Sequence, residues 1–223
     1  NPRQIAMDLA SLFALAWPML LKGTGYTLLF AVASMIFGLP LAGLVTLIRV
    51  LQVWGLSSLM ALYVSVIRGT PLLVQIFIFY YGLPSVGIEL SPITAGILTL
   101  TLNVAAYMSE TLRGSINAVT QGQWQAGTSL GLTRDQTLRY VVGPQALRAA
   151  VPSLSNSLIS LIKDTSLVSV IAVTELMLAT KELISTTFQP FPLYLAAAAI
   201  YWVLSLSFEQ IQRWMEKRVA YPY

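Results

Sequence analysis

Two overlapping stretches of the chain match patterns that catalytic proteins use. Residues Gly127 to Gly131 spell G-x-S-x-G, the pattern of a serine nucleophile on a strand-to-helix turn. Gly122 and Gly127 have the spacing of the two glycines of a phosphate-binding loop, but Thr128-Ser129 stand where that loop needs lysine followed by serine or threonine. The 223 residues also include no histidine and no cysteine. Serine hydrolysis, ATP binding by this loop, thiol chemistry and the usual zinc sites are therefore excluded.

The composition indicates a membrane protein. The chain is 56% hydrophobic and 10% charged, with a mean hydropathy of +0.72, whereas a soluble domain carries about 25% charged residues. A membrane-spanning helix needs about 20 mostly apolar residues. On this basis the sequence predicts an all-α, polytopic membrane protein with five transmembrane helices, over residues 24–48, 56–81, 93–108 with its continuation, 154–178 and 191–208.

The N-terminal stretch is expected to lie apart from these spans. Residues 5–20 repeat apolar side chains at helical spacing, which favours a helix at the outer membrane surface over a poorly ordered terminus. The predicted organisation is an interfacial segment over residues 1–20, a transmembrane domain over 21–218 with a polar loop at 119–145, and a C-terminal tail over 219–223.

Basic residues set the predicted orientation, because cytoplasmic flanks of membrane spans are enriched in lysine and arginine. Such residues follow spans one, three and five: Arg49, then Arg113, Arg134, Arg139 and Arg148, and finally Arg213, Lys217 and Arg218. With five spans, all three groups fall on one side. The polar loop and the C-terminus are predicted to be cytoplasmic, and the N-terminus lies outside.

The polar loop is predicted to form two short helices around Gly131. Thr120 with Gln123, and Thr133 with Gln136, each fit the Thr-x-x-Gln form of the capping box, which satisfies free amides at a helix start. One interpretation of such a loop is a solvated connector between spans. The other is a docking element for a partner.

Ionisable and amide side chains within the spans are candidates for a polar path, because they are costly in lipid. Asp164 is the first of these, and its alternative role is an ion pair with Arg68. Pro71 removes a backbone donor and disfavours helix at Thr70, so the second span is predicted to unwind there and expose backbone groups. Gln75 follows four residues later and either binds ligand or forms an interhelical hydrogen bond.

A similar choice applies to the third span. Asn103, Tyr107 and Glu110 are spaced by four and three residues and so share one helix face. Asn103 either contacts a ligand or bonds to another helix. Glu110 is predicted to make a local salt bridge with Arg113, three residues later.

The polar loop resembles the cytoplasmic coupling loop of bacterial ABC importer permeases. That motif is Glu-Ala-Ala, three residues, Gly, nine residues, then Ile-x-Leu-Pro. Residues at the matching spacings are Gln125, Ala126, Gly131, Val141 and Pro144, with Gln125, Gly127, Val141 and Gly143 departing from the motif in residue type. Four further stretches are similar to the polar amino acid branch (histidine, glutamine, arginine and cystine types): Arg68 to Leu72, Tyr80 to Pro84, Ser109 to Gly114 and Ile162 to Leu167.

The resemblance implies a type I ABC importer permease fold and a role in transport, without enzymatic activity. It implies that residues 125–131 form a helix that docks on an ATPase subunit, with the contact centred on Gln125, Ala126, Gly127 and Gly131. It further implies that ATP and Mg²⁺ bind the ATPase and no cofactor binds this chain. The expected partners are two ATPase subunits, a second permease subunit (identical or not), an extracytoplasmic solute-binding protein, an amino acid and membrane lipid, with no nucleic acid, in the bacterial inner membrane.

The resemblance also bears on the substrate. Family members that carry cationic amino acids often have Asn-Glu where this chain has Asn156-Ser157, so one carboxylate is missing here. A neutral or zwitterionic polar amino acid is therefore predicted, with cystine and glutamine both open, and Asp164 would meet its α-ammonium group. The predicted path residues are Arg68, Thr70, Gln75, Asn103, Tyr107, Ser157 and Asp164. The alternative function is a secondary transporter or channel driven by an ion gradient.

Overall fold

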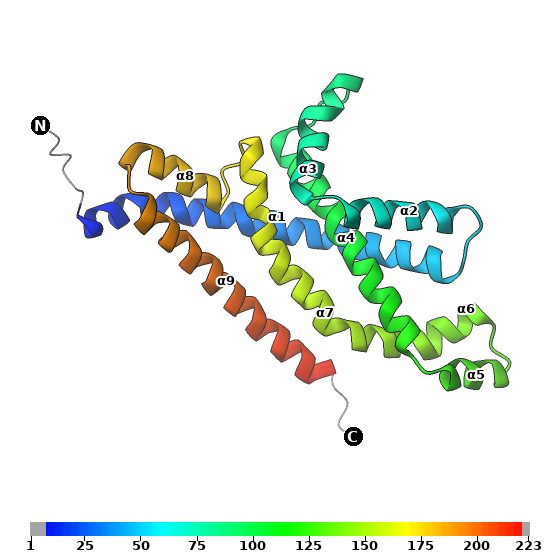
Figure 1. Ribbon diagram of the computed structural model, residues 1–223. Coiled ribbons are helices and arrows are strands. Elements are labelled where there is room, and N and C mark those ends of the chain that lie inside the picture. The colour runs from blue at the N-terminus through cyan, green and yellow to red at the C-terminus, as the bar shows by residue number, and fades with distance from the viewer. Residues whose placement is uncertain (1–7, 220–223) are drawn as a thin grey trace, which may run out of the picture.

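The computed structural model describes residues 8–219, and within that range the chain folds into helices without any strand (Figure 1). The predicted all-α class is confirmed. The helices are α1 (Leu9–Val50), α2 (Leu56–Gly69), α3 (Leu72–Phe77), α4 (Pro92–Ala118), α5 (Gln121–Ser129), α6 (Arg134–Thr137), α7 (Gly143–Asp164), α8 (Leu176–Thr187) and α9 (Pro190–Val219). Short 3-10 or π segments are η1 (Ile78–Gly82), η2 (Leu83–Val86), η3 (Leu138–Val142) and η4 (Thr165–Ile171).

Helix α1 is longer than predicted. It has 42 residues and runs without a break through Pro18 and Pro40, which gives a length of about 63 Å at 1.5 Å per residue. The N-terminal segment is therefore helically continuous with the first span from Leu9 onward. Its first turns are held because Leu12, Ala16 and Leu20 pack in a buried cluster with side chains of α8 and α9. The predicted stretch from Ile5 to Met7 and the tail from Ala220 lie outside the described residues.

Three or four helical units of the described chain could span a membrane. Among residues 8–219, α1, α4 and most of α9 are long and apolar enough to cross a membrane, and the pair formed by α2 and residues 72–86 adds a fourth if this bent unit counts as one span. Helix α7 has 22 residues but carries Arg148, Lys163 and Asp164 together with several serines. The count of five spans therefore stays a prediction.

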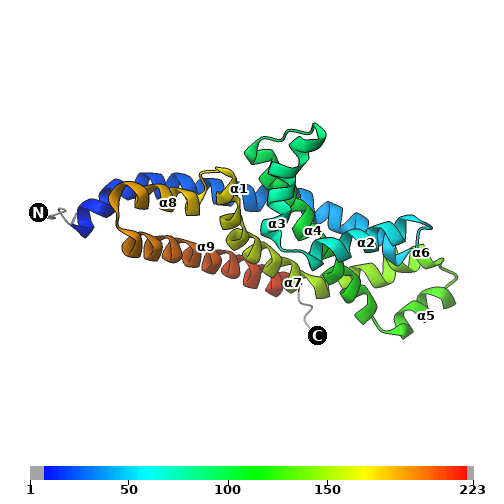
Figure 2. The same cartoon turned by 45° about the horizontal axis from the view of Figure 1, so that its top comes forward.

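The fourth predicted span has the wrong bounds. Residues 154–178 were expected to form one helix, but α7 begins at Gly143, with Pro144 in its first turn, and ends at Asp164. The next residues form the 3-10 segment η4, which ends at Ile171 and is followed by Ala172 with a positive φ of 59°. Because this segment is rich in β-branched residues, an apolar composition alone does not continue the α-helix. A separate helix, α8, follows and lies along the N-terminal half of α1, with α9 beside it (Figure 2).

The core lies where α1, α4 and α7 cross. Phe30, Leu100, Met108 and Ile162 are fully buried there. Two glycines permit the close approach: a Cβ at Gly38 would lie 2.7 Å from Cγ1 of Val104 on α4, and a Cβ at Gly96 would lie 2.7 Å from the Phe30 ring. Both distances are far below ordinary carbon contacts.

Replacing Gly38 with alanine is expected to destabilise the protein by about 1–3 kcal/mol, since the added methyl group overpacks the contact between α1 and α4. Gly43→Ala is the matched control on the same helix, because its Cβ would meet nothing within 4 Å. Thermal unfolding of the purified variants in detergent measures the difference. Equal melting temperatures for both variants would contradict the packing described here.

Candidate functional site

The break between α2 and α3 is closed by side chains. Helix α2 ends at Gly69, Thr70 is extended, and α3 begins after Pro71, so α2 and the helical unit over residues 72–86 meet at a sharp bend of 108°. The amide nitrogen of Gln75 donates to the backbone oxygens of Ile67 (2.8 Å) and Thr70 (3.1 Å) and lies 2.9 Å from Thr70 Oγ1. The predicted unwinding is confirmed, and Gln75 satisfies the carbonyl groups that it frees.

The same glutamine connects this break to α4. Asn103 donates from Nδ2 to Gln75 Oε1 at 3.0 Å, and Gln75 is 4% exposed. Of the two roles predicted for Gln75 and Asn103, ligand binding and an interhelical hydrogen bond, the structure supports the hydrogen bond for both. Three of the predicted path residues, Thr70, Gln75 and Asn103, therefore form one network that stiffens the bend.

Glu110 on α4 holds three arginines. Arg113 Nη2 lies 2.7 Å from Glu110 Oε2, Arg49 from α1 donates to Oε1, and Arg68 Nη1 from α2 lies 3.8 Å from Oε2. The predicted local pair with Arg113 is confirmed. The alternative pairing of Arg68 with Asp164 is wrong, because Arg68 reaches Glu110 and stacks 5.4 Å from the ring centre of Tyr107.

Helix α7 presents a polar stripe. Ser153, Ser157, Ser160 and Asp164 recur at intervals of four, three and four residues and so lie on one face. Ser157 donates to the backbone oxygen of Ser153 at 3.1 Å. In the described part of the chain, no hydrogen bond or salt bridge engages the carboxylate of Asp164, and none joins this stripe to the group around Gln75.

The polar loop folds as two helices around a tight turn, as predicted. Gly131 has a φ of 78°, a left-handed conformation that favours glycine. The capping box at Thr133 forms, with Gln136 closing it at 2.9 Å and 3.2 Å. The one predicted at Thr120 does not form. The helical part of the expected docking element is α5, which ends at Ser129, so Gly131 lies in the turn and not in the helix.

Gly127 has a structural role within this loop. It is buried, and a Cβ there would lie 2.5 Å and 2.6 Å from Cγ2 and Oγ1 of Thr137. Gln125 and Ala126, its neighbours on α5, are exposed. The close contact with Thr137 therefore fixes α5 against the end of α6 and leaves the opposite side of α5 free.

One polar cluster was missed by the sequence analysis. Glu175 is fully buried and accepts hydrogen bonds from the backbone amides of Met177 (2.9 Å) and Leu178 (2.8 Å) and from Tyr201 Oη (2.9 Å). Thr27 of α1 accepts from the Leu176 amide at 3.2 Å. The cluster ties α1, α8 and α9 together. Glutamate is not among the favoured N-cap residues, so helix-start rules give no signal for it.

These features define a class. Long apolar helices, one bent pair whose break is bridged by amides, and an exposed helical loop at one end (Figure 1) indicate a membrane-spanning protein, and such a break is tolerated at membrane depth only inside protein or beside a water-filled cavity, as in transport proteins. The chain belongs to the family described as binding-protein-dependent transport system inner membrane component, whose model matches residues 38–221.

Relatives and a solved structure agree with this assignment. The chain is 43% identical to the L-cystine transport system permease protein TcyB of Bacillus subtilis (strain 168), over 91% of this chain and 87% of that protein. It is 36% identical to the glutamine transport system permease protein GlnP of Escherichia coli (strain K12), over 92% of this chain and 94% of that one. A crystal structure of an amino acid ABC transporter with histidines superposes with a TM-score of 0.90 at 33% identity, covering 96% of this chain and 100% of that chain.

The fold is therefore that of a type I ABC importer permease, and the role of the chain is transport and not catalysis.

Proposed function

We propose that this chain is the permease subunit of an ATP-driven importer of neutral or zwitterionic polar amino acids. The observation that carries the substrate class is the carboxylate of Asp164, which no other described side chain neutralises by a hydrogen bond or salt bridge. A carboxylate left open on a polar helix face suits an α-ammonium group. Ser157, on the same face, adds no second negative charge that would select a cationic side chain.

Arg68 supports the same proposal because it offers a positive charge for the carboxylate of the substrate. Its side chain is 44% exposed and lies 3.8 Å from Glu110, so its guanidinium keeps free donors for a carboxylate. Tyr107, beneath it, is 45% exposed. Gln75, Thr70 and Asn103 contribute mainly by holding the bent backbone in place. Two relatives are named as permeases of L-cystine and glutamine transport systems, and both substrates are polar amino acids of the proposed class.

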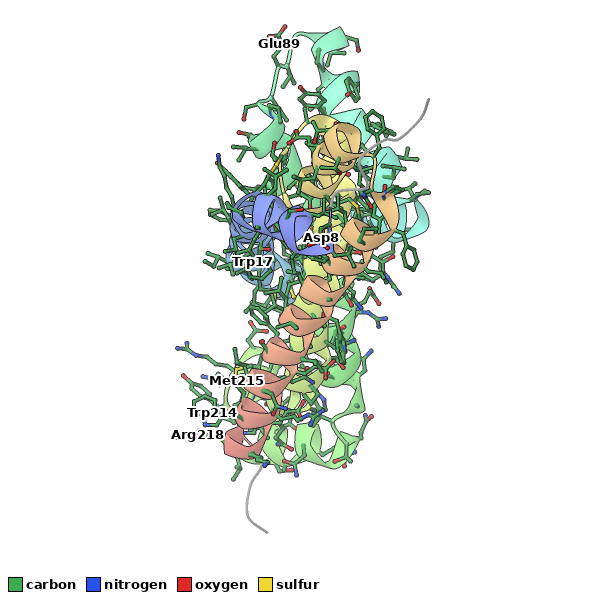
Figure 3. The ribbon with its side chains drawn as sticks, turned by 90° about the vertical axis from the view of Figure 1, so that its left-hand side faces the viewer. Asp8, Trp17, Glu89, Trp214, Met215 and Arg218 are labelled. Carbon is green, nitrogen blue, oxygen red and sulfur yellow. The ribbon has the colours of Figure 1, made fainter. Side chains whose placement is uncertain are left out.

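The proposed partners follow from the family. The exposed side of α5, with Gln125 and Ala126, docks on an ATPase that binds ATP and Mg²⁺, while a second permease subunit and an extracytoplasmic solute-binding protein complete the complex. The proposed location is the bacterial inner membrane, with the N-terminus outside. In support of a common side for the polar loop and the C-terminal end, Trp214, Met215 and Arg218 lie toward the end that carries α5 and α6, and Glu89 lies at the opposite end of the molecule (Figure 3).

The proposal is tested by uptake into vesicles that contain this chain, its ATPase and its binding protein. Competition by cystine, glutamine, histidine and arginine should rank the neutral and zwitterionic amino acids above arginine. Uptake must also require ATP. Accumulation by vesicles that contain this chain alone, driven by a proton or sodium gradient, would instead establish a secondary transporter.

Gly127→Ala is expected to lower substrate-stimulated ATP hydrolysis several-fold, because the new methyl group cannot fit against Thr137 and must move α5. Gly122→Ala is the matched control on the same helix, since its Cβ would meet nothing within 4 Å. Both variants are compared for ATPase activity in the reconstituted complex. Equal activity in the two would show that the packing of α5 on Thr137 does not matter for coupling.

A further inference from the structure

A basic pocket is lined by residues at the C-terminal ends of α1 and α4 and by residues of α5. These helix ends lie at the right-hand end of the molecule in Figure 1. Its volume is about 760 Å³. Three arginines line it, one from each of α1, α4 and α6: Arg49, Arg113 and Arg134. Neutral polar side chains fill much of the remaining wall, and none of its described lining residues is acidic. The pocket is thus built to hold negative charge.

The charge of these arginines is only partly compensated. Arg49 and Arg113 share the single carboxylate of Glu110, which Arg68 also approaches. Arg134 donates to the backbone oxygen of Val50 at 3.3 Å and makes no salt bridge with a described residue, although Asp135 is its neighbour in the sequence. The site around the pocket therefore keeps a net positive charge that an anion can neutralise.

The donors in this pocket match one kind of anion. Guanidinium groups offer planar, forked N–H donors that fit the oxygens of phosphate, and the amides of Asn117 and Gln121 add neutral donors. The pocket also lies at the end of two apolar helices, and Trp54, two residues after Gln52 of its wall, is 97% exposed in the connection between α1 and α2. Tryptophan and arginine in such a position are typical of the membrane–water interface, where lipid phosphates lie.

We propose that this pocket binds a phosphate group, supplied either by the headgroup of an anionic phospholipid or by free inorganic phosphate. Trp124, Gln125 and Thr128 of α5 form part of the same wall. A bound phosphate would therefore bridge α5 to the ends of α1 and α4 and stiffen the contact between them. The binding itself does not depend on the proposed transport function, so each can fail separately.

The test uses the purified full chain. In the lipid arm, native mass spectrometry compares the retention of phosphatidylglycerol and phosphatidylcholine after release from mixed nanodiscs. In the free-anion arm, calorimetry in a neutral detergent measures binding of inorganic phosphate. Arg134→Gln should weaken the binding that either arm detects by roughly tenfold, the loss expected for one charge-assisted hydrogen bond.

Two further variants keep the test decisive. Asn117→Asp leaves all three arginines in place but adds a negative charge to the wall, so it should weaken binding as well. Arg213→Gln removes one positive charge from α9, where Arg213 pairs with Glu209 at 3.7 Å outside the pocket, and should leave binding unchanged. Preference for phosphatidylglycerol identifies the lipid as the source, and saturable phosphate binding identifies the free anion. The proposal is wrong if neither phosphatidylglycerol nor inorganic phosphate binds, or if Arg213→Gln weakens binding as much as Arg134→Gln. The absence of any binding would instead indicate that the arginines pair with acidic groups of a protein partner.

Discussion

Replacing Asp164 with asparagine is expected to lower amino acid uptake by about 10- to 100-fold, the range for losing one charge-assisted contact. The proposed partner of this carboxylate is the α-ammonium group of the substrate, and asparagine keeps the shape of the side chain but not its charge. Uptake of a radiolabelled amino acid by vesicles that contain the complete transporter measures the effect.

Because no described side chain bonds to Asp164, the substitution should leave folding and assembly intact. Size-exclusion chromatography of the complex checks this directly. Asp8→Asn is the matched control, since Asp8 lies exposed at the start of α1 and makes no capping bond with its side chain. Normal uptake by the Asp164 variant would remove this residue from the path, and loss of the assembled complex would show a structural role instead.

Glu110→Gln is expected to lower the free energy of unfolding by about 2 kcal/mol, between the values for an exposed and a fully buried ion pair. The reason is that Arg49, Arg68 and Arg113 share this carboxylate, whose side chain is 17% exposed. The value is below that of a fully buried pair because Arg68 and Arg113, at 44% and 37% exposure, retain contact with water. Chemical denaturation of the purified chain in detergent measures the change.

The control for this variant is Glu209→Gln on α9. Glu209 pairs with Arg213 at 3.7 Å, and both side chains are well exposed, so its loss should cost less than about 1 kcal/mol. A Glu110 variant as stable as the Glu209 variant would mean that the three arginines are solvated independently. The contact between the ends of α1, α2 and α4 would then rest on apolar packing alone.

Local sequence rules predicted the features that depend on few residues. The break at Gly69 to Pro71 follows from the backbone restrictions of proline, and the turn at Gly131 follows from the conformational freedom of glycine. The capping box at Thr133 formed, but the one at Thr120 did not. Gln123 instead accepts a hydrogen bond from Gln145 at 3.0 Å, a contact between residues 22 positions apart.

The partners of charged groups were harder to predict because they depend on how helices cross. Arg68 was assigned to Asp164 as one alternative, but the path of α2 along α4 brings it to Glu110. The buried role of Glu175 likewise requires that α1, α8 and α9 meet. Hydropathy also placed the fourth helix too late, since Arg148 and Pro152 lie inside α7 and depress its apolar signal. The substrate path itself stays a prediction.

The length of α1 has a mechanical consequence. At about 63 Å it is twice the thickness of the hydrocarbon layer, and its ends are anchored separately: near Leu12 by α8 and α9, and at Arg49 by Glu110. A rotation of about 10° about its midpoint would shift each end by roughly 5 Å in opposite directions. The helical continuity of α1 thereby couples motion on one side of the bilayer to motion on the other.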